Sequence, residues 1–239
     1  MGRGTGEGMG AVFWSDLGLA PYRETVALQG RLRARVLSRS LAGYILFLEH
    51  PPTITLGHSL RGDEGRSALR TGLSELERAG IAVVEVDRGG KATYHGPGQL
   101  VCYPVVSLKE LHLGVKRYVG RLMEVVVEGL SELGVAAELD PSYPGVWCQG
   151  AKLAAVGIRV EERVTTHGFA VNVAPDLAAF RHIVPCGISD RPVTSLAGLG
   201  ARVPAREELI RVLLGQMRLK LKIEPAYLAP EQVWAEGKE

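Results

Sequence analysis

Cys186 is the residue of this sequence best suited to act as a nucleophile. It lies between Pro185 and Gly187 in the stretch "RHIVPCGISDRPVTSL". Proline stiffens the backbone before the cysteine and glycine frees it afterwards, so this turn could present the thiol to a pocket. A lone cysteine is more often a small buried hydrophobe, so the choice between the two interpretations depends on which other groups the chain supplies.

Three further stretches carry groups that could work with a thiol. Lys152 stands near the start of the apolar run "GAKLAAVGIRV", where partial desolvation would make it a usable base, although most such lysines reach the surface. His167 precedes Gly168 in "THGFAVNV". A satisfied core histidine is the ordinary interpretation, while a glycine in a strand indicates close approach by a ligand or another backbone.

The third stretch is "RGGKATYHGPGQL", residues 88–100, which places glycines and polar side chains between two predicted strands. It is either a ligand-binding loop or a plain hairpin loop. It lacks the GxxxxG frame of a nucleotide-binding P-loop and is not a dinucleotide fingerprint. A thiol, an amine, an imidazole and a Gly-rich loop together favour acyl transfer through a thioester, because a thiolate needs a nearby base or positive charge.

Composition narrows the alternatives. The 239 residues are 46% hydrophobic, enough for a full core, and no apolar run approaches the ~20 residues that span a bilayer. The N-terminal "MGRGTGEGMG" lacks the apolar centre of a signal peptide, so we expect a cytoplasmic protein. Cys102, Cys148 and Cys186 are too few for a disulfide framework, and without CxxC or HExxH we expect no metal site.

Apolar periodicity predicts both strands and helices. Strands are predicted over 11–19, 43–50, 81–87, 99–108, 135–139 and 145–150, with a hairpin formed by 151–160 and 164–173. Helices are predicted over 21–40, 72–80, 115–134, 176–183 and 204–222, with Asp176 as a cap. Because strands and helices are mixed without strict alternation, we predict an α+β (mixed α/β) fold with a largely antiparallel or mixed sheet.

We expect residues 1–10 to form a flexible tail and residues 11–239 a single catalytic domain, since no linker divides the chain. The net charge of +2 fits an acidic partner without requiring one. Four arginines of the first predicted helix, Arg31, Arg33, Arg35 and Arg39, form either a docking surface or an ordinary solvated face. Aromatic residues do not alternate with these arginines, so the helix shows no sign of nucleic-acid binding.

The four motifs, in this order along the chain, resemble those of the octanoyltransferases of lipoate biosynthesis. The resemblance rests on "RGGKATYHGPGQLVCYP", "GAKLAAVGIRV", "THGFAVNV" and "PCGISDRPVTSL", which fall within residues 40–200. It implies a biotin/lipoate protein ligase-like domain, with a mixed sheet flanked by helices. It also implies octanoyl transfer from octanoyl-acyl carrier protein to a lysine of a lipoyl domain, without a cofactor. The acceptors would be lipoyl domains of 2-oxoacid dehydrogenase complexes and the glycine cleavage H protein.

Carried over residue by residue, the resemblance makes Cys186 the acyl-thioester nucleophile and Lys152 its basic partner, with His167 in a supporting role. We therefore expect Lys152 and Cys186 to meet in space. Cys102 and Cys148 are expected to be packed residues. The expected substrate-binding residues come from three segments: Arg88, Gly89, Gly90, Lys91, Ala92, Thr93, Tyr94 and His95; Ala155, Val156 and Gly157; and Gly168, Phe169 and Ala170.

Two alternatives remain open at this point. An ATP-dependent lipoate- or biotin-protein ligase would need no cysteine nucleophile but would bind an adenylate. A silent binding module for lipoylated domains would need neither Lys152 nor Cys186. Small side chains at Ala155, Gly157 and Gly168 would leave room for an alkyl chain.

Overall fold

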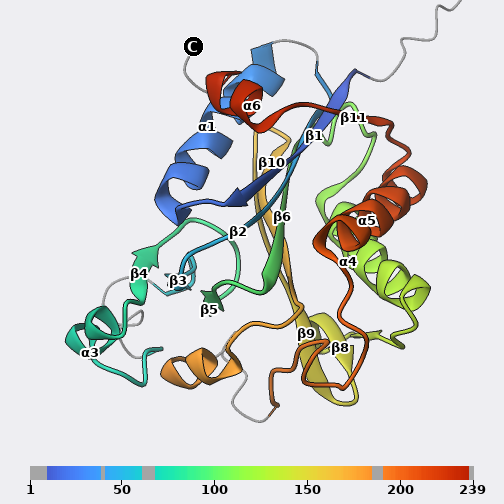
Figure 1. Cartoon of the computed structure of the whole chain (residues 1–239). Helices are drawn as coiled ribbons and strands as arrows, with labels where there is room; N and C mark the ends of the chain where they lie inside the picture. Colours follow the sequence, from blue (N-terminus) through green and yellow to red (C-terminus); the bar gives the residue numbers. More distant parts are fainter. Residues whose placement is uncertain (1–9, 39–40, 61–67, 185–190, 237–239) are drawn as a thin grey trace, which may run out of the picture.

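The computed structural model describes residues 10–38, 41–60, 68–184 and 191–236. A large mixed sheet forms its centre, with helices on both faces (Figure 1). The strand order is β11-β1-β2-β6-β10-β9-β8-β7. In chain order these strands are β1 (Val12–Leu19), β2 (Gly43–Glu49), β6 (Gln99–Val106), β7 (Glu138–Asp140), β8 (Tyr143–Cys148), β9 (Ala151–Glu161), β10 (Val164–Asn172) and β11 (Pro225–Tyr227). The predicted α+β class is confirmed.

The sheet is parallel at one edge and antiparallel elsewhere. β11, β1 and β2 run parallel, and the connection from β1 to β2 is α1 (Tyr22–Ser38). All pairs from β2 to β7 are antiparallel. β2 and β6 are buried almost throughout, because both faces of the sheet are covered, and this explains their nearly continuous apolar sequences.

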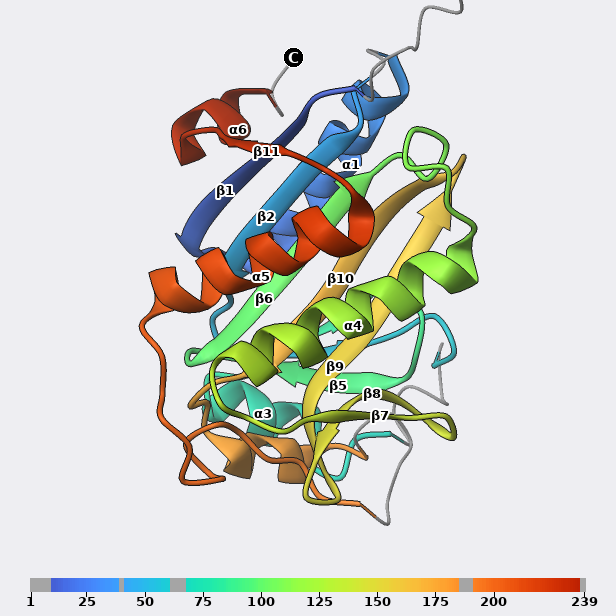
Figure 2. The same cartoon turned by 90° about the vertical axis from the view of Figure 1, so that its right-hand side faces the viewer.

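Helices cover the two faces of the large sheet. On one face lie α4 (Val115–Glu132) and α5 (Arg206–Leu221), which pack against each other (Figure 2). Apolar side chains of both helices join one core cluster with the inner residues of the sheet. α1 packs on the opposite face, where Leu28 and Leu32 join a second cluster, and α6 (Pro230–Glu236) contacts α1 and β1.

A second, three-stranded sheet lies beside the large one. Its order is β4-β3-β5, with β4 (Ala82–Glu85), β3 (Thr53–Leu56) and β5 (Ala92–His95). The segment 88–100 is therefore not a simple loop between strands, because it contains β5. β4 falls within the predicted strand 81–87, whereas β3 and β5 were not predicted, because four residues are too few for a period of two to identify a strand.

Short helices accompany the small sheet. α3 (Leu73–Arg78) packs on β4, and the 3-10 helix η1 (Leu177–His182) contacts β5. The side chain of Asp176 accepts a hydrogen bond from the Ala178 amide, which confirms the predicted cap. The predicted tail lies, apart from Gly10, outside the described residues. None of the described helices combines the length and apolar character needed to cross a membrane.

Gly168 is the position where the large sheet admits no side chain. A Cβ atom there would collide with the backbone carbonyl of Cys102 on β6. We expect Gly168→Ala to lower the free energy of unfolding by about 2 kcal/mol or more, as in other overpacked cores, measured by urea unfolding. Gly30→Ala is the matched control, since Gly30 is an exposed residue of α1 with open space around it and alanine should add up to ~1 kcal/mol. Equal effects in the two variants would contradict the prediction.

Candidate active site

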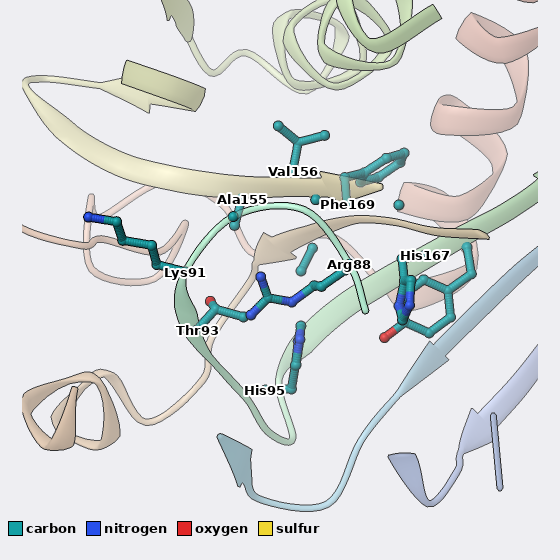
Figure 3. A pocket seen from close by; sticks show the side chains of 13 residues that line it. Arg88, Lys91, Thr93, His95, Ala155, Val156, His167 and Phe169 are labelled. Atoms are coloured by element: carbon teal, nitrogen blue, oxygen red, sulfur yellow. The ribbon is translucent and has the colours of Figure 1, made fainter. Parts of the chain in front are cut away.

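A narrow slot lies between β9, β10 and the segment 88–95 (Figure 3). Eleven of the fourteen residues predicted to bind substrate line it, and so does His167. The exceptions are Gly89, Ala92 and Tyr94. Tyr103 on β6 also lines the slot and was not predicted, because a tyrosine within an apolar strand gives no sign in the sequence of the cavity it faces. The structure thus brings together three segments separated by many residues in the sequence.

The segment 88–95 is fixed by backbone hydrogen bonds on both sides. The Gly89 amide donates to the carbonyl of Ile158 on β9 at 3.0 Å, and the His58 amide donates to the carbonyl of Arg88 at 3.0 Å. The Arg88 guanidinium is buried and donates through Nη2 to both the carbonyl and the hydroxyl of Thr55 on β3, at 2.9 and 2.7 Å. Gly90 adopts a φ of 87°, a conformation that favours glycine.

Two of the small residues have a different role from the one the sequence suggested. A Cβ atom on Gly157 would stand 2.9 Å from the carbonyl oxygen of Gly89, and one on Gly168 would meet the backbone of β6. These glycines therefore permit close packing of backbone on backbone, rather than simply leaving room for an alkyl chain. Ala155 lines the slot, and for that position room for an alkyl chain stays a prediction.

Hydrogen bonds fix the protonation of two buried histidines. His50 Nδ1 lies 2.7 Å from the carbonyl of Ala20, which only accepts, so Nδ1 carries the proton. Its Nε2 lies 2.9 Å from the hydroxyl of Tyr103. Burial lowers the pKa of His50 to about 4, so the neutral ring accepts the proton of the tyrosine. The Tyr103 hydroxyl is thereby oriented at the slot wall.

His95 is held in one tautomer by Gln99. The Gln99 amide nitrogen donates to the carbonyl of Tyr94 at 3.2 Å and to Asn172 Oδ1 at 2.9 Å, which leaves its oxygen as an acceptor. That oxygen lies 2.6 Å from His95 Nδ1, so Nδ1 is the protonated nitrogen. Burial, together with nearby His50 and Arg88, keeps the pKa of His95 well below its ordinary value. In the neutral ring, Nε2 is then a hydrogen-bond acceptor.

His167 forms a pair with Asp87. Its Nε2 lies 2.8 Å from Asp87 Oδ1, and the hydrogen bond from His167 is the main reason that the pKa of Asp87 is lowered to about 2. Arg159 Nη1 reaches the other carboxylate oxygen at 2.5 Å. The backbone of His167 adopts a φ of 58°, and its amide donates to Gln29 of α1 at 2.6 Å. Hydrogen bonds thus hold both the backbone amide and the imidazole ring of His167 in place.

Lys152 lies on the same strand as part of the slot but does not line it. The lysine is 5% exposed, and its Nζ stands 5.0 Å from the centre of the Trp147 ring on β8, a cation–π arrangement. The Arg191 guanidinium lies 5.2 Å from the same ring and binds Asp140 at 2.8 Å. Within the described ranges, no carboxylate forms an ion pair with the Lys152 ammonium.

The segment 192–194, which follows Cys186 in the sequence, is hydrogen bonded to the backbone of Lys152. The Lys152 amide donates to the carbonyl of Pro192, and the Thr194 amide donates to the carbonyl of Lys152, both at 2.9 Å. Asn172 Nδ2 donates to the carbonyl of Thr194 at 2.9 Å. Since Asn172 also binds Gln99, a buried chain of hydrogen bonds joins the main chain at Lys152 to the slot.

Cys186 falls outside the described residues, so its predicted meeting with Lys152 stays a prediction. The other two cysteines are buried. Burial raises the pKa of Cys102 well above its ordinary value. Burial and the charge of Glu138 raise the pKa of Cys148, whose Sγ donates to the carbonyl of Ala136. Neither is suited to act as a thiolate.

The surface of α1 offers less free positive charge than its sequence suggests. Arg33 forms ion pairs with Glu161 and Glu162, and Arg35 pairs with Glu236. These pairs favour the solvated-face interpretation of this helix over the docking surface. Among the described residues, no group of three or more histidine, cysteine, aspartate or glutamate side chains is placed to hold a metal ion.

Comparison with known proteins relates the chain to enzymes that handle lipoyl groups. A family model described as the lipoyl protein ligase A/B catalytic domain matches residues 21–218. An octanoyltransferase from Chloroflexus aurantiacus is 42% identical over 212 residues, covering 87% of this chain and 93% of the relative. An octanoyltransferase from Geobacter metallireducens is 43% identical over 190 residues, covering 79% and 84%.

Solved structures share the fold at low sequence identity. Lipoate-protein ligase A bound with ATP matches with a TM-score of 0.73 at 19% identity, covering 95% of this chain and 93% of the other. Biotin protein ligase from Aquifex aeolicus, in complex with biotin and ATP, matches with a TM-score of 0.53 at 16% identity, covering 89% and 70%. The expected biotin/lipoate protein ligase-like fold is confirmed.

Gly90 allows the effects of backbone strain and of side-chain bulk on the slot to be separated. A Cβ atom there would stand 3.5 Å from Arg88 Nη1, an ordinary contact, but at a φ of 87°. We expect Gly90→Ala to reduce turnover through backbone strain, which costs about 1 kcal/mol or more. Gly90→Val should reduce it much further by filling the slot. Steady-state kinetics on folded variants would measure turnover. Equal turnover in the two variants would contradict the prediction that side-chain bulk at position 90 fills the slot.

The buried histidines predict loss of stability in acid. His50 has a pKa of about 4 in the folded chain against an ordinary 6.5, so the unfolded chain binds its proton first as the pH falls below 6.5. The free energy of unfolding should therefore drop between pH 6.5 and 4, by about 3 kcal/mol from His50 on the linkage relation. The lowered pKa of His95 acts in the same direction.

Urea unfolding at a series of pH values would measure this loss. His50→Gln should flatten the pH dependence, whatever its effect on stability at neutral pH. His112→Gln, at an exposed histidine, is the control that should keep the parental dependence. An unchanged slope in His50→Gln would show that His50 does not cause the loss.

Proposed function

The chain belongs to the lipoyl protein ligase A/B catalytic-domain family, and within it to the octanoyltransferases, which are acyltransferases of lipoate biosynthesis; we propose that it takes octanoyl from acyl carrier protein onto Cys186 and passes it to a lysine of a lipoyl domain. One observation carries the proposal. The slot and Lys152 share strand β9, and the backbone at Lys152 is hydrogen bonded to the segment that follows Cys186.

The slot suits an acyl chain that enters from the Lys152 end. Ala155 and Ala170, which pair across β9 and β10, supply a wall of small apolar side chains, whereas the side chains of Val156 and Phe169 join the core on the opposite face of the sheet. Each methylene buried from water contributes about 0.8 kcal/mol, so even part of an octanoyl chain adds several kcal/mol of binding, less the cost of ordering the chain. Figure 3 shows Ala155 on the strand beside Arg88 and Thr93, with the side chains of Val156 and Phe169 pointing away from those two residues.

In the first half-reaction, Lys152 accepts the proton of the Cys186 thiol. The thiolate attacks the carbonyl carbon of the octanoyl thioester, the bond from that carbon to the carrier's sulfur breaks, and the proton passes from Lys152 to the leaving thiolate. A positive charge on Lys152, held over the face of Trp147, favours the thiolate. Cys186 then carries the octanoyl group as a thioester.

In the second half-reaction, the neutral amine of the lipoyl-domain lysine attacks the enzyme thioester. The amide bond forms, Cys186 leaves as a thiolate, and Lys152 takes up the proton lost by the amine. A covalent intermediate suits two protein substrates, since two carrier domains could not both reach one narrow slot at once. Each carrier would therefore visit in turn.

The proposal predicts an acyl-enzyme on Cys186 alone. Incubation with octanoyl-acyl carrier protein, without ATP or acceptor, should add the mass of one octanoyl group, and peptide mapping should place it on Cys186. Cys186→Ser should form little acyl-enzyme, because a hydroxyl is much harder to deprotonate. Cys148→Ser is the control, since Cys148 is packed against Ala136, and it should acylate like the parent. Acylation at another cysteine would overturn the mechanism.

Lys152→Ala should slow acylation by roughly 10²–10⁴-fold, the usual size of a lost acid–base contribution, while thermal unfolding remains cooperative. Single-turnover acylation followed by intact mass would measure the rate. If transfer required a free acid and ATP instead, the chain would act as a ligase. An acylation rate in Lys152→Ala equal to that of the parent enzyme would show that Lys152 is not the base.

A further inference from the structure

The slot contains polar atoms that a hydrocarbon chain cannot satisfy. His95 is 5% exposed and lines the slot, and no described residue donates a hydrogen bond to its Nε2. Because Gln99 holds the proton on Nδ1, Nε2 is a fixed acceptor on the opposite side of the ring. A hydroxyl that enters the slot beside this nitrogen would therefore have an acceptor for its proton.

His167 supplies a second unpartnered nitrogen in the same slot. Its Nε2 is bound to Asp87, and its buried Nδ1 has no partner among the described residues. The two imidazoles differ in one respect. The hydrogen bonds around His95 leave its free nitrogen as an acceptor, whereas those around His167 do not fix whether Nδ1 carries a proton. His95 is therefore the better defined recognition group.

The position of the slot along β9 determines which part of a substrate reaches these atoms. Ala155, the first residue of β9 to line the slot, lies three positions after Lys152, or about 10 Å along a strand. If the acyl carbonyl is held near Lys152, as the proposed function requires, the slot receives the distal part of the chain. Figure 3 shows His95 below the Arg88 side chain in this cavity.

We propose that the slot also accepts octanoyl chains bearing a hydroxyl in their distal part, with His95 Nε2 as the hydrogen-bond acceptor for that hydroxyl. The inference rests on the proposed function and extends its substrate class. In an apolar slot, burying a hydroxyl without a partner would reduce kcat/KM roughly tenfold to hundredfold. A hydrogen bond to His95 would cancel most of that loss.

The test compares acyl carrier proteins loaded with octanoyl, 8-hydroxyoctanoyl, 8-fluorooctanoyl or 3-hydroxyoctanoyl groups. With the full-length enzyme and a lipoyl domain, 8-hydroxyoctanoyl should be transferred with a kcat/KM within about threefold of octanoyl, and at least as well as the 8-fluoro chain, which cannot donate. A kcat/KM for the 8-hydroxy chain a hundredfold below octanoyl would overturn the inference. This comparison needs no variant.

His95→Phe tests the assignment of the acceptor. The ratio of kcat/KM for 8-hydroxyoctanoyl to that for octanoyl should fall about tenfold or more in this variant, whatever happens to octanoyl transfer itself. The ratio for 3-hydroxyoctanoyl should not change, because that hydroxyl lies near the carbonyl. His167→Phe is the matched variant of the other slot histidine and should keep the 8-hydroxy ratio. If the 8-hydroxy ratio fell in His167→Phe and not in His95→Phe, His95 would not be the acceptor.

The two proposals can fail separately. Absence of octanoyl transfer from the carrier protein would overturn the proposed function. Octanoyl transfer with rejection of 8-hydroxyoctanoyl would overturn only the extended substrate class. If His95→Phe does not fold, the comparison of the 8-hydroxy and 8-fluoro chains in the parent enzyme still decides the inference.

Discussion

A continuous chain of buried hydrogen bonds joins the main chain at Lys152 to the wall of the slot. Thr194 binds the Lys152 carbonyl, Asn172 binds Thr194, Gln99 binds Asn172, and His95 binds Gln99. All five residues are buried, so losing one member would leave an unsatisfied polar group in a low-dielectric interior. This chain fixes both the position of the lysine strand and the tautomer of the slot histidine.

The slot combines two demands that are difficult to meet together. An acyl chain needs apolar walls, yet the segment that closes the slot must be held by polar groups. The fold separates these tasks by side: Ala155 and Ala170 come from the large sheet, whereas Arg88 is fixed by Thr55 of the small sheet. The residual polarity at His95 follows from this construction, because its ring is also part of the network that holds the loop.

Much of the fold and of the slot lining could be predicted from the sequence, because long apolar runs and Gly-rich motifs report local geometry. The hairpin of β9 and β10 and the helices α4 and α5 are of this kind. Of the small sheet, β4 was predicted, but β3 and β5 were missed because four residues are too few for a period to identify a strand. The place of Tyr103 in the slot and the hydrogen bond that His167 donates to Asp87 depend on contacts between segments distant in the sequence, which no local pattern encodes.

Gly157 on β9 determines how closely the segment 88–95 approaches the large sheet. Because Gly157 carries no side chain, the segment packs against β9 at backbone distance, and this packing forms part of the slot. In this chain the segment that follows Cys186 is hydrogen bonded to the backbone of Lys152. β9 therefore carries both a wall of the slot and the backbone to which that segment is attached.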